Sequence, residues 1–268
     1  MIKDFFFASA LLAPAFAYAA TPSADLSVKV VPAQSSCLAD SICPAGVTWS
    51  LVFDEEMSKG YLSSLFGPIS RADEGCNCYS DGVHGFSFPG DGTLTMNGWA
   101  AESLPASGGK HGGITISSTQ NYAAPGYYEI KASIGSDWNG MFTLGNYVCP
   151  AAVPGEMDFI ENPAANGHLA SYYHNGTSGC EYDHVVANEG TDFQNVHVYG
   201  FDVSTSRGLT AYVDGVAMGN MPSSWLSIGL CTNASVCGTK IWLQAGGPGG
   251  DAVPMKVYWI RYYTGVPQ

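Results

Sequence analysis

Short strand-like runs, rather than helical periodicity, constrain the fold of this chain most strongly. Apolar and β-branched residues gather in brief runs that end at Gly, Pro, Asn or Asp, which is typical of strands. In YYEIKASI (127–134), Glu129 and Lys131 alternate with apolar side chains, as in an antiparallel strand that buries one face. Asp214 and Gly215 separate two further runs, as in a tight hairpin. About ten such runs without helices predict an all-β fold, a two-sheet antiparallel β-sandwich of the jelly-roll type.

The first twenty residues have the layout of an export signal. Lys3 precedes an apolar run that ends in small residues, including Ala17 and Ala19 at cleavage-site spacing. No later apolar run approaches the length of about 18 residues that a membrane span needs. No long linker and no internal repeat divides the remainder. We therefore expect a signal peptide at 1–20 and one domain at 21–268, secreted, monomeric and not embedded in a membrane.

Cysteine usage agrees with export. The chain has eight cysteines, and an even number behind a signal peptide is typical of a disulfide framework. Cys37 with Cys43, and Cys231 with Cys237, could each close a short loop, although the sequence leaves the full pairing open. Zinc is the alternative, but no two cysteines have the C-x₂-C spacing of zinc fingers. We predict no metal site from these residues.

The charge of the chain restricts its partners. The formal net charge is −13 at pH 7, which repels phosphate backbones and anionic lipids. Nucleic acid and membrane surfaces are therefore not expected as partners. A neutral polysaccharide would not be repelled, so the charge permits such a substrate without indicating it.

Three acids lie close together in GEMDFIEN (155–162): Glu156, Asp158 and Glu161. On a regular strand Glu156 and Asp158 share a face while Glu161 falls on the other. One extra residue in a β-bulge would bring Glu161 to the same face. Two glutamates on one face suit glycoside hydrolysis, in which one attacks the anomeric carbon and the other protonates the leaving oxygen. A solvated acidic face or a set of calcium ligands is the alternative.

The same segment resembles the active-site signature of glycoside hydrolase family 16 in its bulged form, E-x-D-x-x-E. WSLVFDEEM (49–57) resembles the start of the family domain, whereas positions 58–113 match poorly. The resemblance continues in the family's order along the chain, in APGYYEIKASI (124–134), DWNGMFTLGN (137–146), NVHVYGFDVSTSRGLTAYVDGVAM (195–218), IWLQAGGPGG (241–250) and VYWIRYYT (257–264).

The resemblance implies a concanavalin-like β-jelly roll and a retaining endo-glycosidase. It assigns Glu156 as the nucleophile, Asp158 as its assisting acid and Glu161 as the acid/base. The bulged signature is similar to that of β-1,3-glucanases and marine galactanases, which favours a β-1,3- or β-1,3/1,4-glucan as substrate. A β-galactan hydrolase, a transglycosylase and a non-catalytic sugar-binding jelly roll remain as alternatives. No cofactor is implied, and a structural calcium ion, which some relatives bind, has no sequence signal here.

Four further residues are candidates for sugar binding. Trp138 matches a family segment whose aromatic side chains stack on sugars. Phe142 stands where Trp is usual, and Trp242 stands where Asn is frequent. His174 lies on the run after the acidic segment and could bond a sugar hydroxyl or tune the acid/base, or serve as a structural histidine.

Overall fold

The protein is described from a computed structural model, in which regular structure is almost entirely β-strand. The described residues contain sixteen strands and two short 3-10 helices, η1 (Met57–Lys59) and η2 (Pro105–Ser107). The structure describes residues 37–73, 77–101, 103–122, 125–135, 140–145, 156–161, 170–174, 182–186, 192–204, 208–221, 240–246 and 253–267.

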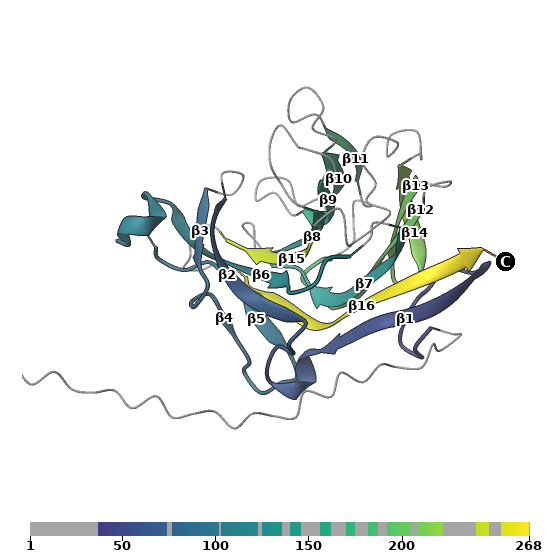
Figure 1. Ribbon diagram of the computed structural model, residues 1–268, viewed down its shortest axis with the longest axis horizontal. Helices are drawn as coiled ribbons and strands as arrows, with labels where there is room; N and C mark the ends of the chain where they lie inside the picture. The colour runs from purple at the N-terminus through teal and green to yellow at the C-terminus, as the bar shows by residue number, and fades with distance from the viewer. Residues whose placement is uncertain are drawn as a thin grey trace, which may run out of the picture. The chain divides into compact units, whose positions relative to one another are not determined.

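The strands form two sheets, which we call sheet A and sheet B (Figure 1). In sheet A, β1 (Val47–Glu56) pairs with β16, beside a continuous path of seven strands. In order along that path they are β14 (Val216–Met221), β13 (Gly208–Val213), β12 (His197–Ser204), β7 (Gly126–Ser133), β16 (Met255–Pro267), β5 (Leu94–Met96) and β4 (Phe86–Ser87).

Sheet B has eight strands, and all their pairings are antiparallel except that of β3 with β6. In Figure 1 its strands curve upward from β15 and β6 toward β3 at one end and β11 at the other, so its outer face is concave, while β11 stays beside β14 of sheet A. The strands in order are β11 (Tyr182–Val186), β10 (Ala170–His174), β9 (Glu156–Glu161), β8 (Met141–Gly145), β15 (Lys240–Ala245), β6 (His111–Ser118), β2 (Phe66–Asp73) and β3 (Cys78–Asp81).

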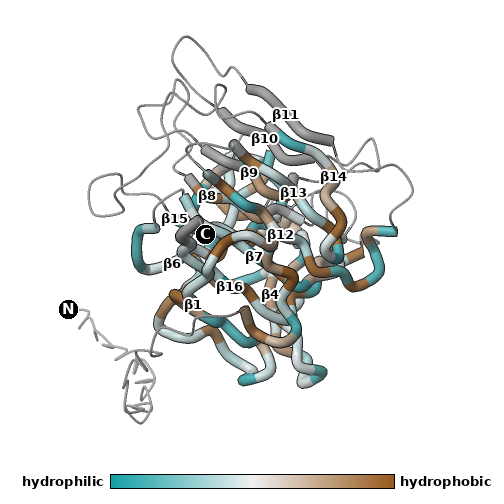
Figure 2. Tube along the Cα trace, turned by 90° about the vertical axis from the view of Figure 1, so that its right-hand side faces the viewer, coloured by the Kyte–Doolittle hydropathy of each residue, from teal (hydrophilic) through white to brown (hydrophobic). Residues whose placement is uncertain are grey.

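The hydrophobic core lies between the two sheets. Phe159 of β9 is fully buried, and its ring stacks on Phe201 of β12 with centroids 4.9 Å apart. Its ring also lies 4.8 Å from that of Tyr128 on β7. Aromatic pairs at these separations add stability beyond the area they bury. Hydropathy alternates along many of the described strands (Figure 2), as expected where one face of each sheet packs against the core. The predicted two-sheet β-sandwich is confirmed.

Two local predictions are also confirmed. Asp214 and Gly215 both have positive φ, 49° and 83°, and they connect the paired strands β13 and β14. Cys37 and Cys43 form a disulfide, and no described cysteine is free. The predicted signal peptide and the pair Cys231 and Cys237 lie outside the described residues. Within the described ranges, no helix is long and apolar enough to cross a membrane.

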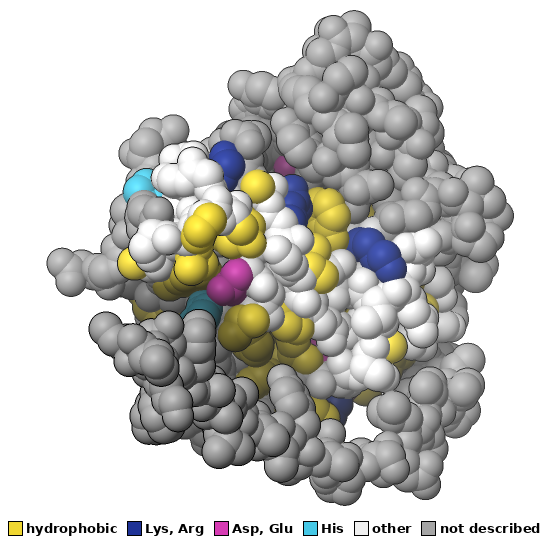
Figure 3. Space-filling view, turned by 60° about the vertical axis from the view of Figure 1, so that its left-hand side comes forward, with side chains coloured by type: hydrophobic (Ala, Val, Ile, Leu, Met, Phe, Trp, Pro, Cys, Tyr) yellow, Lys and Arg dark blue, Asp and Glu magenta, His cyan; other side chains and the backbone are white. Residues whose placement is uncertain are grey.

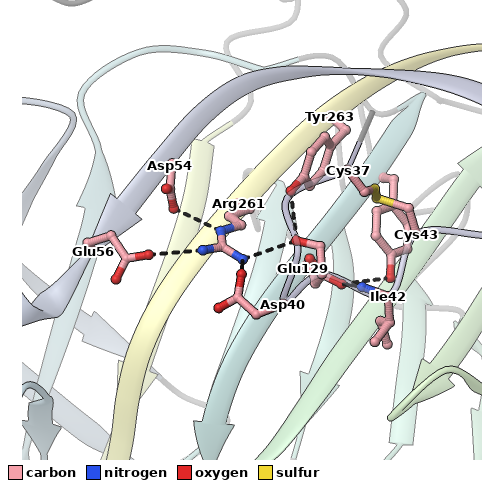
Figure 4. A network of polar contacts seen from close by, with 11 residues as sticks. Cys37, Asp40, Ile42, Cys43, Asp54, Glu56, Glu129, Arg261 and Tyr263 are labelled. Carbon is pink, nitrogen blue, oxygen red and sulfur yellow. Dashed lines mark hydrogen bonds and ion pairs between the residues drawn. A yellow bond between two sulfur atoms is a disulfide. The ribbon is translucent and has the colours of Figure 1, made fainter. Parts of the chain in front are cut away.

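Arg261 of β16 binds the loop closed by the Cys37–Cys43 disulfide to the outer face of sheet A (Figure 4). The guanidinium donates to Asp40 in this loop and to two acids of β1, Asp54 at 2.9 Å and Glu56 at 3.0 Å. It also stacks on Trp259, 3.9 Å from the ring centroid. Burial raises the pKa of Asp40, but the hydrogen bond and charge of Arg261 outweigh this and hold it below 3.8. One buried cation therefore joins the loop to two strands.

Glu129 of β7 stands opposite Arg261 in the sheet and is fully buried. Its Oε1 accepts hydrogen bonds from the Ile42 backbone N–H at 2.6 Å and from the Tyr127 hydroxyl at 3.2 Å. Burial nevertheless raises the pKa of Glu129 above the ordinary 4.5, because removal from water disfavours the charged form. Ionisation of the buried Glu129 therefore lowers the free energy of unfolding.

Replacing Glu129 with glutamine is expected to flatten the pH dependence of stability. An unfolded chain loses the Glu129 proton near pH 4.5, whereas the folded protein retains it to higher pH. The free energy of unfolding therefore falls as pH rises above about 4.5 toward the folded pKa. Glutamine keeps the acceptor oxygen but cannot ionise, so E129Q should gain stability relative to the native protein across this interval. Urea unfolding from about pH 4 to about pH 8 measures this, and parallel stability curves would contradict it.

Candidate functional site

Strand β9 contains one more residue than either of its neighbours requires. On the β8 side, the adjacent residues Phe142 and Thr143 face Ile160 and Asp158, so that the register passes over Phe159. On the β10 side, the register shifts by one residue in the same part of β9. An extra residue opposite both neighbours is a β-bulge. The bulge that the spacing of the acids required is therefore present in the backbone.

The bulge aligns the three acidic positions. Across the β9–β10 pairing, positions 156, 158 and 161 stand opposite residues 174, 172 and 170. These alternate residues of β10 occupy one face of the sheet. Positions 156, 158 and 161 consequently share that face as well. The side chains at 156 and 161 themselves are not among those the structure describes.

Asp158 shows which face this is. The neighbouring residue Phe159 points into the core between the sheets, so Asp158 lies on the outer, concave face of sheet B. Asp158 is only 2% exposed, and Thr143 beside it is 1% exposed. The Thr143 hydroxyl donates to Asp158 Oδ1 at 2.7 Å. A buried carboxylate needs such donors, and this one holds the Asp158 carboxyl in one orientation.

Trp242 lies in the same cross-strand row as Asp158. Thr143 stands opposite Asp158 on one side and opposite Trp242 of β15 on the other. The predicted sugar-binding residue Trp242 is thus two strands from the acidic segment, on the same face. Its side chain is 8% exposed, and the guanidinium carbon of Arg71 lies 4.4 Å from the centroid of its ring.

Phe142 is not on this face, which corrects the prediction that it binds sugar. The side chain is fully buried in the core and its ring centroid lies 5.4 Å from that of Phe159. The physical reason is alternation, because Phe142 directly precedes Thr143, whose hydroxyl is on the concave face. Resemblance to a family segment located the strand correctly but assigned the wrong face to this residue.

The remaining predicted sugar-binding residues are placed only in part. His174 stands opposite Glu156 in the backbone register of β10 and β9, while its side chain is outside the described set. Trp138 lies outside the described residues. Among the described side chains, no group of three or more His, Cys, Asp or Glu is arranged to hold a metal ion.

Sequence reasoning did not single out Arg71. It lies on β2, a strand that contains Gly67 and Pro68, and neither residue is typical of a strand interior. The segment also falls where the sequence resembles the family least. Only the pairing of β2 with β6 brings it to the concave face.

No protein-family model and no curated protein matches the sequence. Solved structures do resemble the fold. The endo-β-1,3-glucanase from Pyrococcus furiosus has a TM-score of 0.63 at 15% identity, over 84% of this chain and 97% of its own. The laminarinase catalytic domain from Thermotoga maritima has a TM-score of 0.60 at 17% identity, over 81% of this chain and 98% of its own. The Bacillus licheniformis β-glucanase has a TM-score of 0.58 at 20% identity, over 78% of this chain and 96% of its own. At these identities the comparison shows shared architecture, so the chain has the two-sheet jelly-roll fold of these glucanases.

Proposed function

We propose that the protein is a secreted, retaining endo-glycoside hydrolase of glycoside hydrolase family 16 whose substrate is a β-1,3- or β-1,3/1,4-glucan. The observation that carries the proposal is the bulge in β9, which gives Glu156, Asp158 and Glu161 positions on one concave face. A regular strand would have put Glu161 on the core side. The fold shared with solved glucanases supports the same conclusion.

The chemistry proceeds in two displacements. In the first, the Glu156 carboxylate forms a bond to the anomeric carbon while the bond from that carbon to the glycosidic oxygen breaks, and Glu161 gives its proton to the departing oxygen. In the second, Glu161 takes a proton from water, the water oxygen attacks the anomeric carbon, and Glu156 is released. Asp158, between them and oriented by Thr143, assists the nucleophile.

A neutral glucan agrees with the electrostatics of the chain. The net charge of −13 would repel a polyanionic polymer at low salt, while an uncharged polysaccharide meets no such barrier. On the side of the molecule shown in Figure 3, the described Lys and Arg side chains stand apart from one another rather than in one basic patch.

Product analysis tests the proposal. The purified protein is incubated with laminarin, lichenan, agarose and a β-galactan, and the products are analysed by mass spectrometry and by NMR of the first anomer released. We expect oligosaccharides from laminarin or lichenan, released initially as the β-anomer. Products longer than the fragments of simple hydrolysis would indicate a transglycosylase. Binding to a β-glycan without any product would favour a sugar-binding jelly roll instead.

Replacing Thr143 with valine is expected to lower kcat roughly tenfold, the equivalent of one hydrogen bond to a charged group. Valine has nearly the same shape but leaves Asp158 without this donor. The acidic limb of the pH–rate profile should move as well, which a purely structural defect would not cause. T143S keeps the hydroxyl and should recover most of the activity. Equal rates for T143V and the native enzyme would contradict the positioning role.

A further inference from the structure

Two adjacent residues of β9, Phe159 and Ile160, both point into the core. Ile160 stands opposite Phe142 in the register with β8, and both side chains of the adjacent pair are fully buried between the sheets. On a regular strand, adjacent side chains point to opposite faces. The β-bulge therefore consists of two apolar side chains turned inward, while the flanking positions 158 and 161 face outward.

The Phe159 ring is held from the opposite sheet. Phe201 of β12 stacks on it with an interplanar angle of 16° and ring centroids 4.9 Å apart. The ring of Tyr128 on β7 lies 4.8 Å from the same ring, and Tyr128 and Phe201 are themselves partners in the pairing of β7 with β12. All three side chains are at most 1% exposed. Two paired residues of sheet A thus form the surface against which Phe159 packs.

Burial of Phe159 keeps the acidic positions on either side of the bulge aligned. A regular strand that kept Glu161 on the concave face would turn Phe159 out of the core and Asp158 into it. A regular strand that kept Asp158 on the concave face would turn Glu161 into the core instead. Only the bulge, with both apolar side chains inside, places all three acidic positions on one face. The packing of Phe159 therefore fixes the proposed nucleophile relative to the proposed acid/base.

We propose that Phe201 is a positioning residue for glycoside hydrolysis, which holds Phe159 in the core and thereby sets the place of Glu161 relative to Glu156. Phe201 itself touches no substrate, because it lies in the core on sheet A, whereas the acidic positions face outward from sheet B. The proposal rests on the proposed function, since it takes Glu161 as the acid. A shift of about 1 Å in a reacting group can cost about a hundredfold in rate, so repacking around a smaller side chain at position 201 has a measurable effect.

Substrates with different leaving groups test the proposal. F201L removes the stacked ring and leaves a smaller apolar side chain. We compare kcat/KM on laminarin or lichenan, whichever the native protein cleaves, with kcat/KM on an activated aryl glycoside of the corresponding oligosaccharide. Only the polysaccharide needs a proton from Glu161. The ratio of the aryl value to the polysaccharide value should therefore rise about tenfold in F201L, whereas a loss of folded protein would lower both values equally.

F53L is the matched control. Phe53 of β1 is buried like Phe201, and its ring packs against those of Phe66, Tyr122 and Tyr262, none of which lies on β9. The ratio in F53L should stay within about twofold of the native value, because the change is made at an independent place in the core. F201M is measured as well, since methionine fills most of the volume without a stacked ring, and its ratio should rise in the same direction. Thermal unfolding identifies the temperature at which each variant is folded.

The double variant F159L/F201L tests the route of the effect. If Phe201 acts through Phe159, the ratio in the double variant should match that in F159L, because both changes remove one contact. Ratios that multiply would overturn this route. Equal ratios in F201L and F53L, together with a raised ratio in Glu161→Ala, would overturn the positioning role alone. An unchanged ratio in Glu161→Ala, or no hydrolysis of any glycan by the native protein, would overturn the positioning role and the proposed function together.

Discussion

Glu156→Ala is expected to lower turnover on the true substrate by about three orders of magnitude or more. The change removes the carboxylate that attacks the anomeric carbon, and alanine offers no substitute. The fold should remain intact, because the negative charge removed is crowded by Asp158 and Glu161 in the same short strand. Steady-state rates together with circular dichroism measure both effects. A variant with near-native activity would show that the site has been assigned to the wrong residue.

The companion variant Glu161→Ala separates the two glutamate roles. It should lose more activity on substrates with poor leaving groups than on activated aryl glycosides, because only the former need a proton from the acid. Azide should partly restore the aryl glycoside reaction, since a small anion can attack the glycosyl-enzyme without a general base. A β-glycosyl azide is the expected product. An α-glycosyl azide would reverse the roles of Glu156 and Glu161.

Arg261→Met is expected to have the largest effect on stability, about 3 kcal/mol at neutral pH. The Arg261 side chain is 4% exposed and pairs with acids that are 53%, 27% and 33% exposed, namely Asp40, Asp54 and Glu56. Methionine keeps much of the packing on Trp259 but leaves these acids, and the buried Glu129 beside them, without their cation. We place the cost at the lower end of the range for buried pairs because water partly screens the three partners. Urea unfolding measures it.

The pH dependence of this loss identifies its cause. Burial alone would raise the pKa of Asp40, but Arg261 lowers it below 3.8, so its stabilising contribution is present above about that pH and is lost as pH falls. Protonation also relieves the mutual repulsion of the acids in R261M. The difference in free energy of unfolding between R261M and the native protein should therefore become smaller as the pH falls to about 3–4. A constant difference across pH would assign the loss to packing.

Lys256→Met provides the matched control on the same strand. Lys256 pairs with Asp91 at 3.1 Å, but both side chains are well exposed, 39% and 44%. Exposed ion pairs contribute little to stability, so K256M should unfold close to the native midpoint. If K256M lost as much stability as R261M, burial of the Arg261 network would not be the source of the effect.

Local patterns predicted much of this protein because they depend on neighbouring residues. The Asp214 and Gly215 turn and the Cys37–Cys43 loop each concern a few consecutive positions, where backbone geometry relates side chains directly. The alternation along Glu129 and Lys131 indicated a strand correctly, but the expectation that it buries only one face was wrong. Glu129 is fully buried and accepts a hydrogen bond from Ile42 of the Cys37–Cys43 loop, which lies far away in the sequence. The spacing of the acids likewise required a bulge, and β9 contains one.

Contacts between distant strands depended on the tertiary structure, because alternation defines two faces of a strand without saying which strand lies beside it. The register of β8 against its neighbours determines the face on which Phe142 lies. The family resemblance had assigned Phe142 to the opposite face. Arg71 reaches Trp242 only because β2, β6 and β15 are adjacent in sheet B. Arg261 likewise meets acids more than 200 positions away in the sequence. Hydrophobic collapse of the two sheets brings these segments together, and no short stretch of sequence contains that information.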